Sequence, residues 1–346
     1  MKQVKVIVAF IAGLFAFTSV QAGEVSVSGS MQVTYESNQD TTTGNPLGMN
    51  TDLTFSGSTD TDFGTATWTM ATDGTFLGES GADHTFKMAT DIGTIGIGNT
   101  GDAANAVDDI TPTAFEEANG SGSGTYSVDV GSGMDGSMSV SYANGDLFGT
   151  GISVAYNYYP KLDATTNNEK GASGDANAAQ SSAQSVNVAI PLAGLPVIGD
   201  SAIGGMKITA GYNESDNRIT DGTPLMGGTV AVTLPVGPLS VGYQKKGYQD
   251  DHTSAVSEAN KAFYKDDIIG LAYAINDDFA ISYNLIESVK HLHSAGTTVE
   301  QETKAINVAY TVGGLTIGLQ DAKTDNAAYA LNSSDDTRTV SIKTAF

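Results

Sequence analysis

The feature that most constrains this chain is an alternation of apolar and polar residues that recurs from one end to the other. In an early segment, apolar Val25, Val27, Met31, Val33 and Tyr35 are separated by serine, glutamine and threonine. A period of two residues is typical of a β-strand, in which successive side chains point to opposite faces. The same pattern occurs at 24–36, 49–57, 64–70, 84–88, 93–98, 124–130, 136–142, 151–159, 184–190, 206–212, 229–234, 239–243, 268–275, 279–285, 305–310, 315–320 and 338–346. The sequence therefore predicts an all-β protein.

The two faces of these strands differ in the same way throughout. One face carries Val, Ile, Leu, Met and aromatic residues, and the other carries Ser, Thr, Asn, Gly and Gln. Tight turns alternate with longer polar segments, which lie at 37–50, 100–123, 160–183, 213–227, 247–266, 287–303 and 321–337. This asymmetry favours a barrel whose apolar side chains face lipid and whose polar side chains line a wet lumen, rather than a soluble sandwich. In hydrocarbon, a closed barrel is the sheet that leaves no backbone edge unpaired.

We expect a transmembrane antiparallel β-barrel of about 16 strands, because single-chain bacterial barrels have an even number. The pattern yields one candidate too many, and the crowded region 124–159 is where the register stays open.

The first residues have the organisation of a secretory signal peptide. Lys2 and Lys5 precede an apolar run over 6–17, and Val20-Gln21-Ala22 supplies compact residues for cleavage. The run is shorter than the roughly 20 residues of a permanent membrane helix. We expect residues 1–22 to be removed and residues 23–346 to form the exported barrel.

Composition excludes other classes of protein. The 39 acidic residues outnumber the 16 basic ones and give a net charge of −23, which argues against a nucleic-acid partner because such a partner needs a basic surface. The chain has no cysteine, so disulfides play no part in its stability.

Several stretches resemble the general porins of the Gram-negative outer membrane, particularly the alphaproteobacterial type. They are "GEVSVSGSMQVTYE", "LTFSGSTDTDFGTATW", "HTFKMATDIGTIGIGNTGDA" and the final "VSIKTAF". The resemblance spans residues 23–346, by pattern more than by identity. It implies a homotrimer in the outer membrane, with a long third loop folded into the pore. It also implies passive diffusion of ions and small hydrophilic solutes, and contacts with outer-membrane lipid, lipopolysaccharide and the barrel-assembly machinery.

The segment 98–124 corresponds in position to the constriction loop of that family. Its acids would form the negative side of a narrow aqueous eyelet if the loop folds inward; they are Asp102, Asp108, Asp109, Glu116 and Glu117. The alternative is that they are solvated loop acids. The glycines at 96, 98 and 101 also spell a Gly-x-Gly-x-x-Gly motif, but no βαβ unit follows, so we reject a dinucleotide site.

The opposite side of the eyelet should be positive. Strand parity places Lys87, Lys207, Lys246 and Lys343 on the lumen face, and Lys87 and Lys343 are the best candidates. Typical porins present clustered arginines here, whereas this chain has only Arg218 and Arg338. That departure weakens the expected transverse field. Because acids exceed bases around the lumen, we expect cations to be preferred.

Phe346 ends the last predicted strand on an aromatic residue. The resemblance implies that this residue is the signal read by the barrel-assembly machinery. We also expect it to close the barrel by pairing with the first strand near Glu24.

We expect neither catalysis nor a cofactor. His84 lies on the apolar face, His252 lies in a long loop, and the pair His291 and His293 is a weak metal signal. The acidic long loops could hold Ca²⁺, although no EF-hand spacing is present. The alternative functions are a substrate-selective channel and a structural barrel or adhesin.

Overall fold

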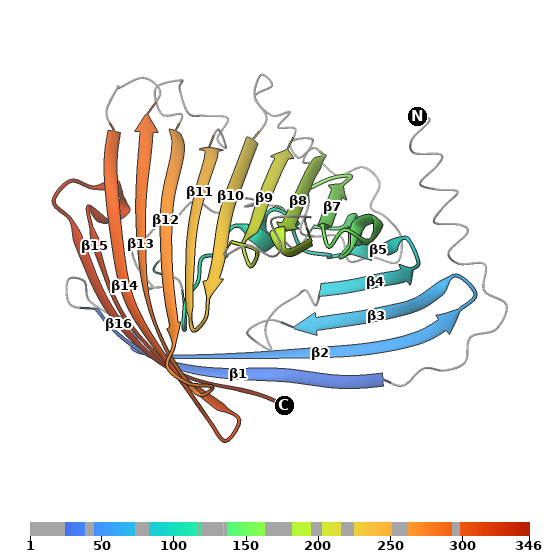
Figure 1. The fold of residues 1–346 in the computed structure, drawn as a ribbon, viewed down its shortest axis with the longest axis horizontal. Coiled ribbons are helices and arrows are strands. Elements are labelled where there is room, and N and C mark those ends of the chain that lie inside the picture. The colour runs from blue at the N-terminus through green and yellow to red at the C-terminus, as the bar shows by residue number, and fades with distance from the viewer. Residues whose placement is uncertain are drawn as a thin grey trace.

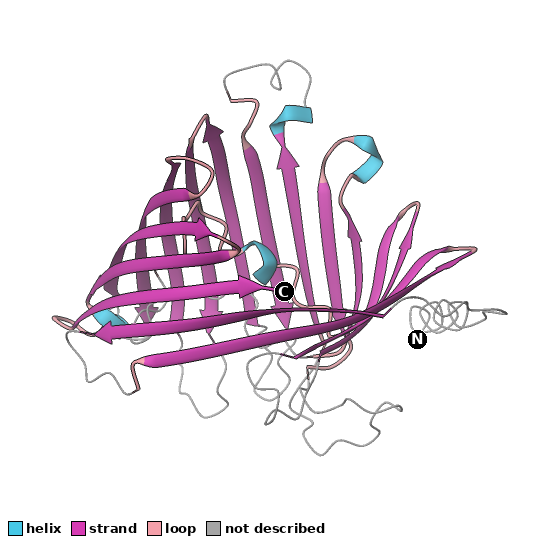
Figure 2. Ribbon diagram, turned by 90° about the horizontal axis from the view of Figure 1, so that it is seen from below, coloured by secondary structure: helices cyan, strands magenta, loops and turns pink. Residues whose placement is uncertain are grey.

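The computed structural model describes residues 25–38, 45–72, 83–116, 118, 134, 137–162, 182–194, 203–215, 225–250, 262–292 and 298–346. They form one antiparallel sheet of sixteen strands that closes on itself, as the sequence predicts (Figures 1 and 2). The strands are β1 (Val25–Asn38), β2 (Leu47–Thr61), β3 (Gly64–Thr72), β4 (Asp83–Thr90), β5 (Gly93–Gly98), β6 (Ser139–Asn144), β7 (Ser153–Tyr159), β8 (Ala183–Pro191), β9 (Lys207–Ser215), β10 (Leu225–Val236), β11 (Leu239–Asp250), β12 (Ala262–Ala274), β13 (Phe279–Leu292), β14 (Thr298–Val312), β15 (Leu315–Asp325) and β16 (Ser334–Ala345).

Helical structure in these ranges is limited to single 3₁₀ turns in the connections, shown in cyan in Figure 2. They are η1 (Asn105–Val107), η2 (Leu147–Gly149), η3 (Leu192–Gly194) and η5 (Ala327–Tyr329). Within the described part of the chain, none is a long apolar helix that could span a membrane.

The barrel closes where the first strand meets the last. Each strand pairs with its neighbour in sequence, and β1 pairs with β16 in a register that places Gln32 opposite Lys343. Phe346 extends this pairing: its N–H donates to Gly29 O at 2.9 Å, and the N–H of Gly29 donates to Phe346 O at 2.8 Å. The sequence predicts a partner near Glu24, and this detail is wrong. The first residues of β1 pair only with β2, because neighbouring strands of a closed barrel are staggered.

Side chains alternate between the lumen and the outer surface. On β11, Gln244 and Lys246 are buried on the lumen side, whereas Tyr243 and Lys245 are exposed on the outer side. The outer surface carries exposed apolar residues on most strands, including Val27, Tyr35, Leu47, Tyr243, Tyr273, Ile306 and Val340. The division of faces is the one that the sequence predicts.

The strands of the second half are longer than predicted. The sequence assigns 247–266, 287–303 and 321–337 to long connections, whereas much of each range is strand. β11 runs to Asp250, β13 runs to Leu292 and β15 runs to Asp325. The prediction failed because the outward positions of these strand ends carry charges, which hide the alternation of apolar and polar residues.

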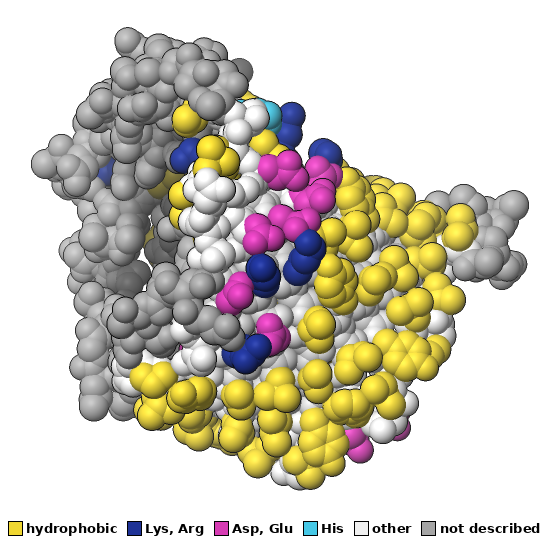
Figure 3. Space-filling view, turned by 90° about the vertical axis from the view of Figure 1, so that its left-hand side faces the viewer, with side chains coloured by type: hydrophobic (Ala, Val, Ile, Leu, Met, Phe, Trp, Pro, Cys, Tyr) yellow, Lys and Arg dark blue, Asp and Glu magenta, His cyan; other side chains and the backbone are white. Residues whose placement is uncertain are grey.

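These outward charges form a belt around β11–β16. The charged belt consists of Lys245, Lys265, Asp267, Glu287, Glu300, Glu302, Lys304, Asp321, Lys323, Asp325, Asp336 and Arg338. Oppositely charged members pair: Lys245 with Asp267 at 2.8 Å and Arg338 with Asp321 at 2.6 Å, and likewise Lys304 with Glu302. Figure 3 shows acidic and basic side chains of this face directly beside a continuous apolar band. The belt therefore marks where the apolar surface of these strands ends.

Two predicted segments lie outside the described residues. One is the signal peptide at 1–22, and the other is the strand candidate at 124–130. The barrel closes without the second, because β5 pairs directly with β6.

Removing Phe346 should lower the yield of folded barrel several-fold, because the last residue completes the pairing of β1 with β16. The measurement is the fraction of outer-membrane protein whose mobility on SDS gels changes on heating. Phe346→Tyr keeps both the backbone bonds and the aromatic ring, and should assemble normally. A normal yield from the deleted chain would contradict this role.

Candidate pore constriction

The loop between β5 and β6 folds inward and follows the inner wall of the barrel. Near its start, Gly101 O accepts a hydrogen bond from Tyr159 of β7 at 2.5 Å, and Ala103 O accepts one from Asn187 of β8 at 2.6 Å. Further on, the N–H of Ala114 donates to Ser282 of β13 at 2.9 Å. The order of contacts along the loop is thus the order of the strands around the barrel. The third loop is folded inward, as expected.

Gln244 of β11 holds the middle of this loop. Its amide nitrogen donates to Asp108 O at 2.6 Å and to Val107 O at 3.0 Å, and its amide oxygen accepts the N–H of Ile110 at 3.2 Å. Beyond it, Asn284 donates to Pro112 O at 3.2 Å. Neutral side chains of the lumen face therefore satisfy loop backbone groups that water would otherwise have to reach.

Asp102 is one of the predicted eyelet acids, and it lies against the wall at 6% exposure. Its carboxylate accepts hydrogen bonds from the Ser185 hydroxyl and from the N–H of Ala104, the latter at 2.7 Å. These bonds fix the start of the loop on β8. Asp102 is therefore placed to shape the loop.

Lys246 of β11 lies beneath the loop and pairs with two of the predicted acids. Its ammonium is 2.5 Å from Asp109 and 4.0 Å from Asp108. The side chains of Lys246 and Asp108 are 0% and 2% exposed, whereas that of Asp109 is 44% exposed. A buried lysine is tolerated when carboxylates surround it, because the pairing offsets the loss of hydration. Of this cluster, Asp109 is the member that reaches the water of the lumen.

Glu116 lies where the loop reaches the seam of the barrel. Its carboxylate accepts a hydrogen bond from Gln32 of β1 at 3.3 Å, and its carbonyl accepts one from Gln320 of β15 at 3.2 Å. Burial raises the pKa of the Glu116 carboxyl above its ordinary value, while the Gln32 bond and the positive charge of Lys343 act in the opposite direction. Glu116 and Lys343 are thus electrostatically coupled across this part of the lumen.

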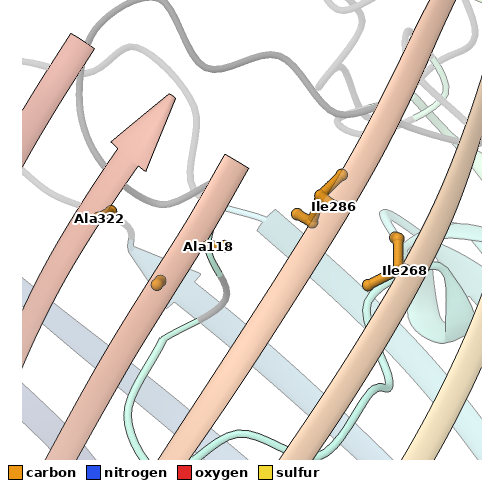
Figure 4. Close-up of a cluster of buried hydrophobic side chains, with 5 residues drawn as sticks. Ala118, Ile268, Ile286 and Ala322 are labelled. Carbon is orange, nitrogen blue, oxygen red and sulfur yellow. The ribbon is translucent and has the colours of Figure 1, made fainter. Parts of the chain in front are cut away.

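A small apolar patch interrupts the polar lumen face. Ile268 and Ile286 point inward from β12 and β13 and are 1% and 2% exposed. Ala118 of the loop, Ala305 and Ala322 complete the buried cluster, four members of which are labelled in Figure 4. These two isoleucines break the parity rule because the loop, not water, covers them.

The remaining predicted residues occupy the positions that parity assigns. Lys87 on β4, Lys207 at the start of β9 and Lys343 near the end of β16 are exposed on the lumen face. Glu117 lies outside the described residues. His84 faces outward beside Trp68, with 6.3 Å between ring centroids, and His291 lies at the same distance from Phe263.

Among the described residues, no group of three or more His, Cys, Asp and Glu side chains could hold a metal ion.

A second polar cluster in the lumen was not predicted from the sequence. Lys290 of β13 lies over the rings of Tyr264 and Tyr329, 5.3 and 5.8 Å from their centroids. The hydroxyl of Tyr329 is 2.6 Å from that of Ser288. Tyr329 belongs to the loop between β15 and β16, so this loop also reaches the inner wall. Its backbone is left-handed at Asn326, Ala328, Tyr329 and Asn332, which no simple pattern predicts.

The family model described as "Gram-negative porin" matches residues 8–345. The chain belongs to the Gram-negative porin family. This porin is similar in fold to a loop-deletion mutant of OmpT, an outer membrane protein of Vibrio cholerae, with a TM-score of 0.63, 12% identity, and coverage of 94% of this chain and 100% of that one. It is also similar to OmpF of Salmonella typhi, with a TM-score of 0.59, 14% identity, and coverage of 94% and 98%.

A mutant porin of Rh. blastica gives a TM-score of 0.57 at 15% identity, covering 93% of this chain and 100% of that one. No curated protein sequence matches. Family membership makes this protein an outer-membrane channel for passive diffusion.

Replacing Lys246 by methionine should destabilise the porin by about 3–5 kcal/mol, because Asp108 would stay buried without its cation. Urea unfolding followed by the fluorescence of Trp68, the single tryptophan, measures the change. Adding Asp108→Asn should recover part of the loss.

Lys245→Met is the matched control, since its pair with Asp267 is exposed on the outer surface and should matter little. Equal effects of the two lysine substitutions would contradict a special role for the buried one.

Proposed function

We propose that this porin prefers cations, and that the inward-folded loop supplies the charge that selects them. The observation that carries the proposal is the placement of Asp109 and Glu116: both lie on the loop inside the barrel, and both are part-exposed. Carboxylates at a constriction lower the energy of a passing cation and raise that of an anion. Selection then needs no binding step, only width and charge.

The charges of the lumen-facing side chains also favour cations. Lumen-side acids of the described chain include Glu36, Asp52, Asp102, Asp108, Asp109, Glu116, Asp266 and Asp335. Lumen-side bases are Lys87, Lys207, Lys246, Lys290 and Lys343. Lys246 is already paired with loop acids, so its charge is largely neutralised. The exposed Lys87 and Lys343 would face the loop as the positive side of the constriction.

A substrate-selective channel is the second candidate. The cluster of Lys290, Tyr264 and Tyr329 favours it, because two neighbouring aromatic rings, tilted by 55° to each other, lie beside a cation and can contact a polar solute. Saturable block of the ion current by one class of solute would support this candidate. A structural barrel would instead be closed to ions. We propose a channel without catalytic activity or cofactor.

The sequence and the family resemblance also bear on export and assembly of the barrel. We propose that residues 1–22 are cleaved as a signal peptide and that the barrel-assembly machinery reads Phe346. We further propose a homotrimer in contact with outer-membrane lipid and lipopolysaccharide. One Vibrio cholerae OmpT structure is described as a trimer form, and β1 and β2 of this chain expose Val25, Leu47 and Met49. Unheated samples should migrate as trimers on SDS gels, and a monomer band alone would contradict this.

The zero-current potential of purified porin in a planar bilayer under a KCl gradient tests the selectivity. We expect an open channel whose potential has the cation-selective sign. The opposite sign would leave the channel function intact and overturn our assignment of charge. Absence of conductance would favour the structural barrel.

Replacing both Glu116 and Glu117 by glutamine should move the zero-current potential toward zero. Glu300→Gln, on the outer surface of β14, should leave the potential unchanged. An unaltered potential in the double variant would place this part of the loop outside the ion path.

Cation preference should also fall as the pH is lowered, and begin to fall at a higher pH than an exposed glutamate would give. Burial raises the pKa of Glu116, so its carboxylate takes up a proton earlier on acidification. Comparing potentials at a series of pH values between the natural chain and Glu116→Gln isolates this contribution. Identical pH profiles would contradict it.

A further inference from the structure

Four glycines of the inner wall lie directly beneath the constriction loop. They are Gly211 on β9, Gly242 on β11, Gly270 on β12 and Gly318 on β15, each at a lumen-facing position. None belongs to the positive-φ glycines of the described chain. Their backbone is ordinary extended strand, which alanine adopts at no cost. Backbone conformation therefore does not explain why these positions are glycine.

Space explains it. A Cβ on Gly270 would lie 2.7 Å from Pro112 O, 2.8 Å from Thr111 Cβ and 2.9 Å from Pro112 N. A Cβ on Gly211 would lie 2.8 Å from Val107 Cγ2 and 3.3 Å from Ala104 Cα. All of these atoms belong to the constriction loop, which occupies the volume that a methyl group would fill.

Gly242 and Gly318 are closer still to the loop. A Cβ on Gly242 would overlap Cδ of the Pro112 ring, and a Cβ on Gly318 would overlap the ring of Phe115. Gly242 and Gly270 are register partners on adjacent strands, so Pro112 packs against two neighbouring wall positions that carry no side chain. Asn284, the register partner of Gly270 on β13, then donates its hydrogen bond to Pro112 O.

Glycines on the outer face of the same region lack such neighbours. A Cβ on Gly247, also on β11, would find its nearest atom at 3.6 Å, and a Cβ on Gly228 of β10 would find its nearest at 3.5 Å. Those are ordinary contact distances. The close approach at Gly242, Gly270 and Gly318 is therefore to loop atoms, whereas Gly211 meets both the loop and, at 3.1 Å, Thr229 Cγ2 of β10.

We propose that these four glycines determine the width of the open pore, by letting the loop backbone lie directly on the wall. The proposal rests on the proposed channel function and adds the residues that set its size limit. Carbon atoms need about 3.5–4.0 Å of separation, so one methyl group at Gly270 would move the loop roughly 1 Å into the lumen. The polar contacts on either side, through Gln244 and Asn284, would hold the displaced loop in the pore.

The test compares Gly270→Ala with Gly247→Ala in planar bilayers. Gly270→Ala should lower the single-channel conductance by roughly a tenth to a third, as expected from a 1 Å shift of the loop. It should also lower the size limit for neutral sugars in liposome swelling. Gly247→Ala should change neither. Conductance and size limit unchanged by Gly270→Ala would overturn the proposal.

A second pair of variants covers the case in which Gly270→Ala does not fold. Gly318→Ala should narrow the pore, and Gly318→Ala combined with Phe115→Ala should restore it, because the overlapping ring is gone. Narrowing that persists in the double variant would overturn the proposal. Lack of conductance in the natural chain would contradict the proposed channel function itself. The conductance of each variant relative to the natural chain tests only the role of the glycines.

Discussion

Pairing of backbone groups across the β1–β16 seam is the constraint on which the rest of this structure depends. A sheet in hydrocarbon has no water to satisfy an open edge, so closure is a condition for residence in the membrane. Gly29 and Phe346 complete the last pairs of that seam. Once the sheet is closed, the period of two separates its faces: apolar side chains point to lipid and polar ones to the interior. The polar interior then allows a long loop to bind to the inner wall.

Loop binding uses three kinds of contact, and each limits pore geometry differently. Neutral amides such as Gln244 and Asn284 satisfy loop carbonyls and fix the loop along the wall. Lys246 neutralises Asp108 beneath the loop, so that burial of the acid is tolerated. The wall glycines set how closely the backbone approaches. Lys246 offsets one of the two charges of Asp108 and Asp109, so this cluster keeps one negative charge, which reaches the lumen through Asp109. Glu116 supplies the other negative charge that faces the lumen.

The sequence was sufficient for the class of fold and the face of each strand, because both depend on local periodicity. The position of the constriction loop was predicted from the resemblance to the general porins. It failed where a partner distant in sequence decides the role of a residue. The alternation of side chains correctly predicted that Lys246 faces the lumen. Only the contact with Asp109, 137 residues away, shows that Lys246 lies under the loop. Glycine on a polar face fits the strand pattern, so the pattern concealed Gly270 and Gly318. The ends of β11–β16 were missed because charged residues occupied positions where apolar residues were expected.

The charged belt gives the barrel an outer surface of unequal apolar height. On β13 the uninterrupted run of outward apolar positions extends from Phe279 to Leu285, and Glu287 separates it from Val289. At ~3.4 Å per residue and a tilt of ~40°, that stretch spans roughly 18 Å along the barrel axis. On β1 the corresponding positions run from Val25 to Tyr35, which gives roughly 29 Å by the same geometry. A bilayer of uniform thickness cannot match both sides, so hydrophobic mismatch must thin the lipid beside β13 or draw another apolar surface against β1.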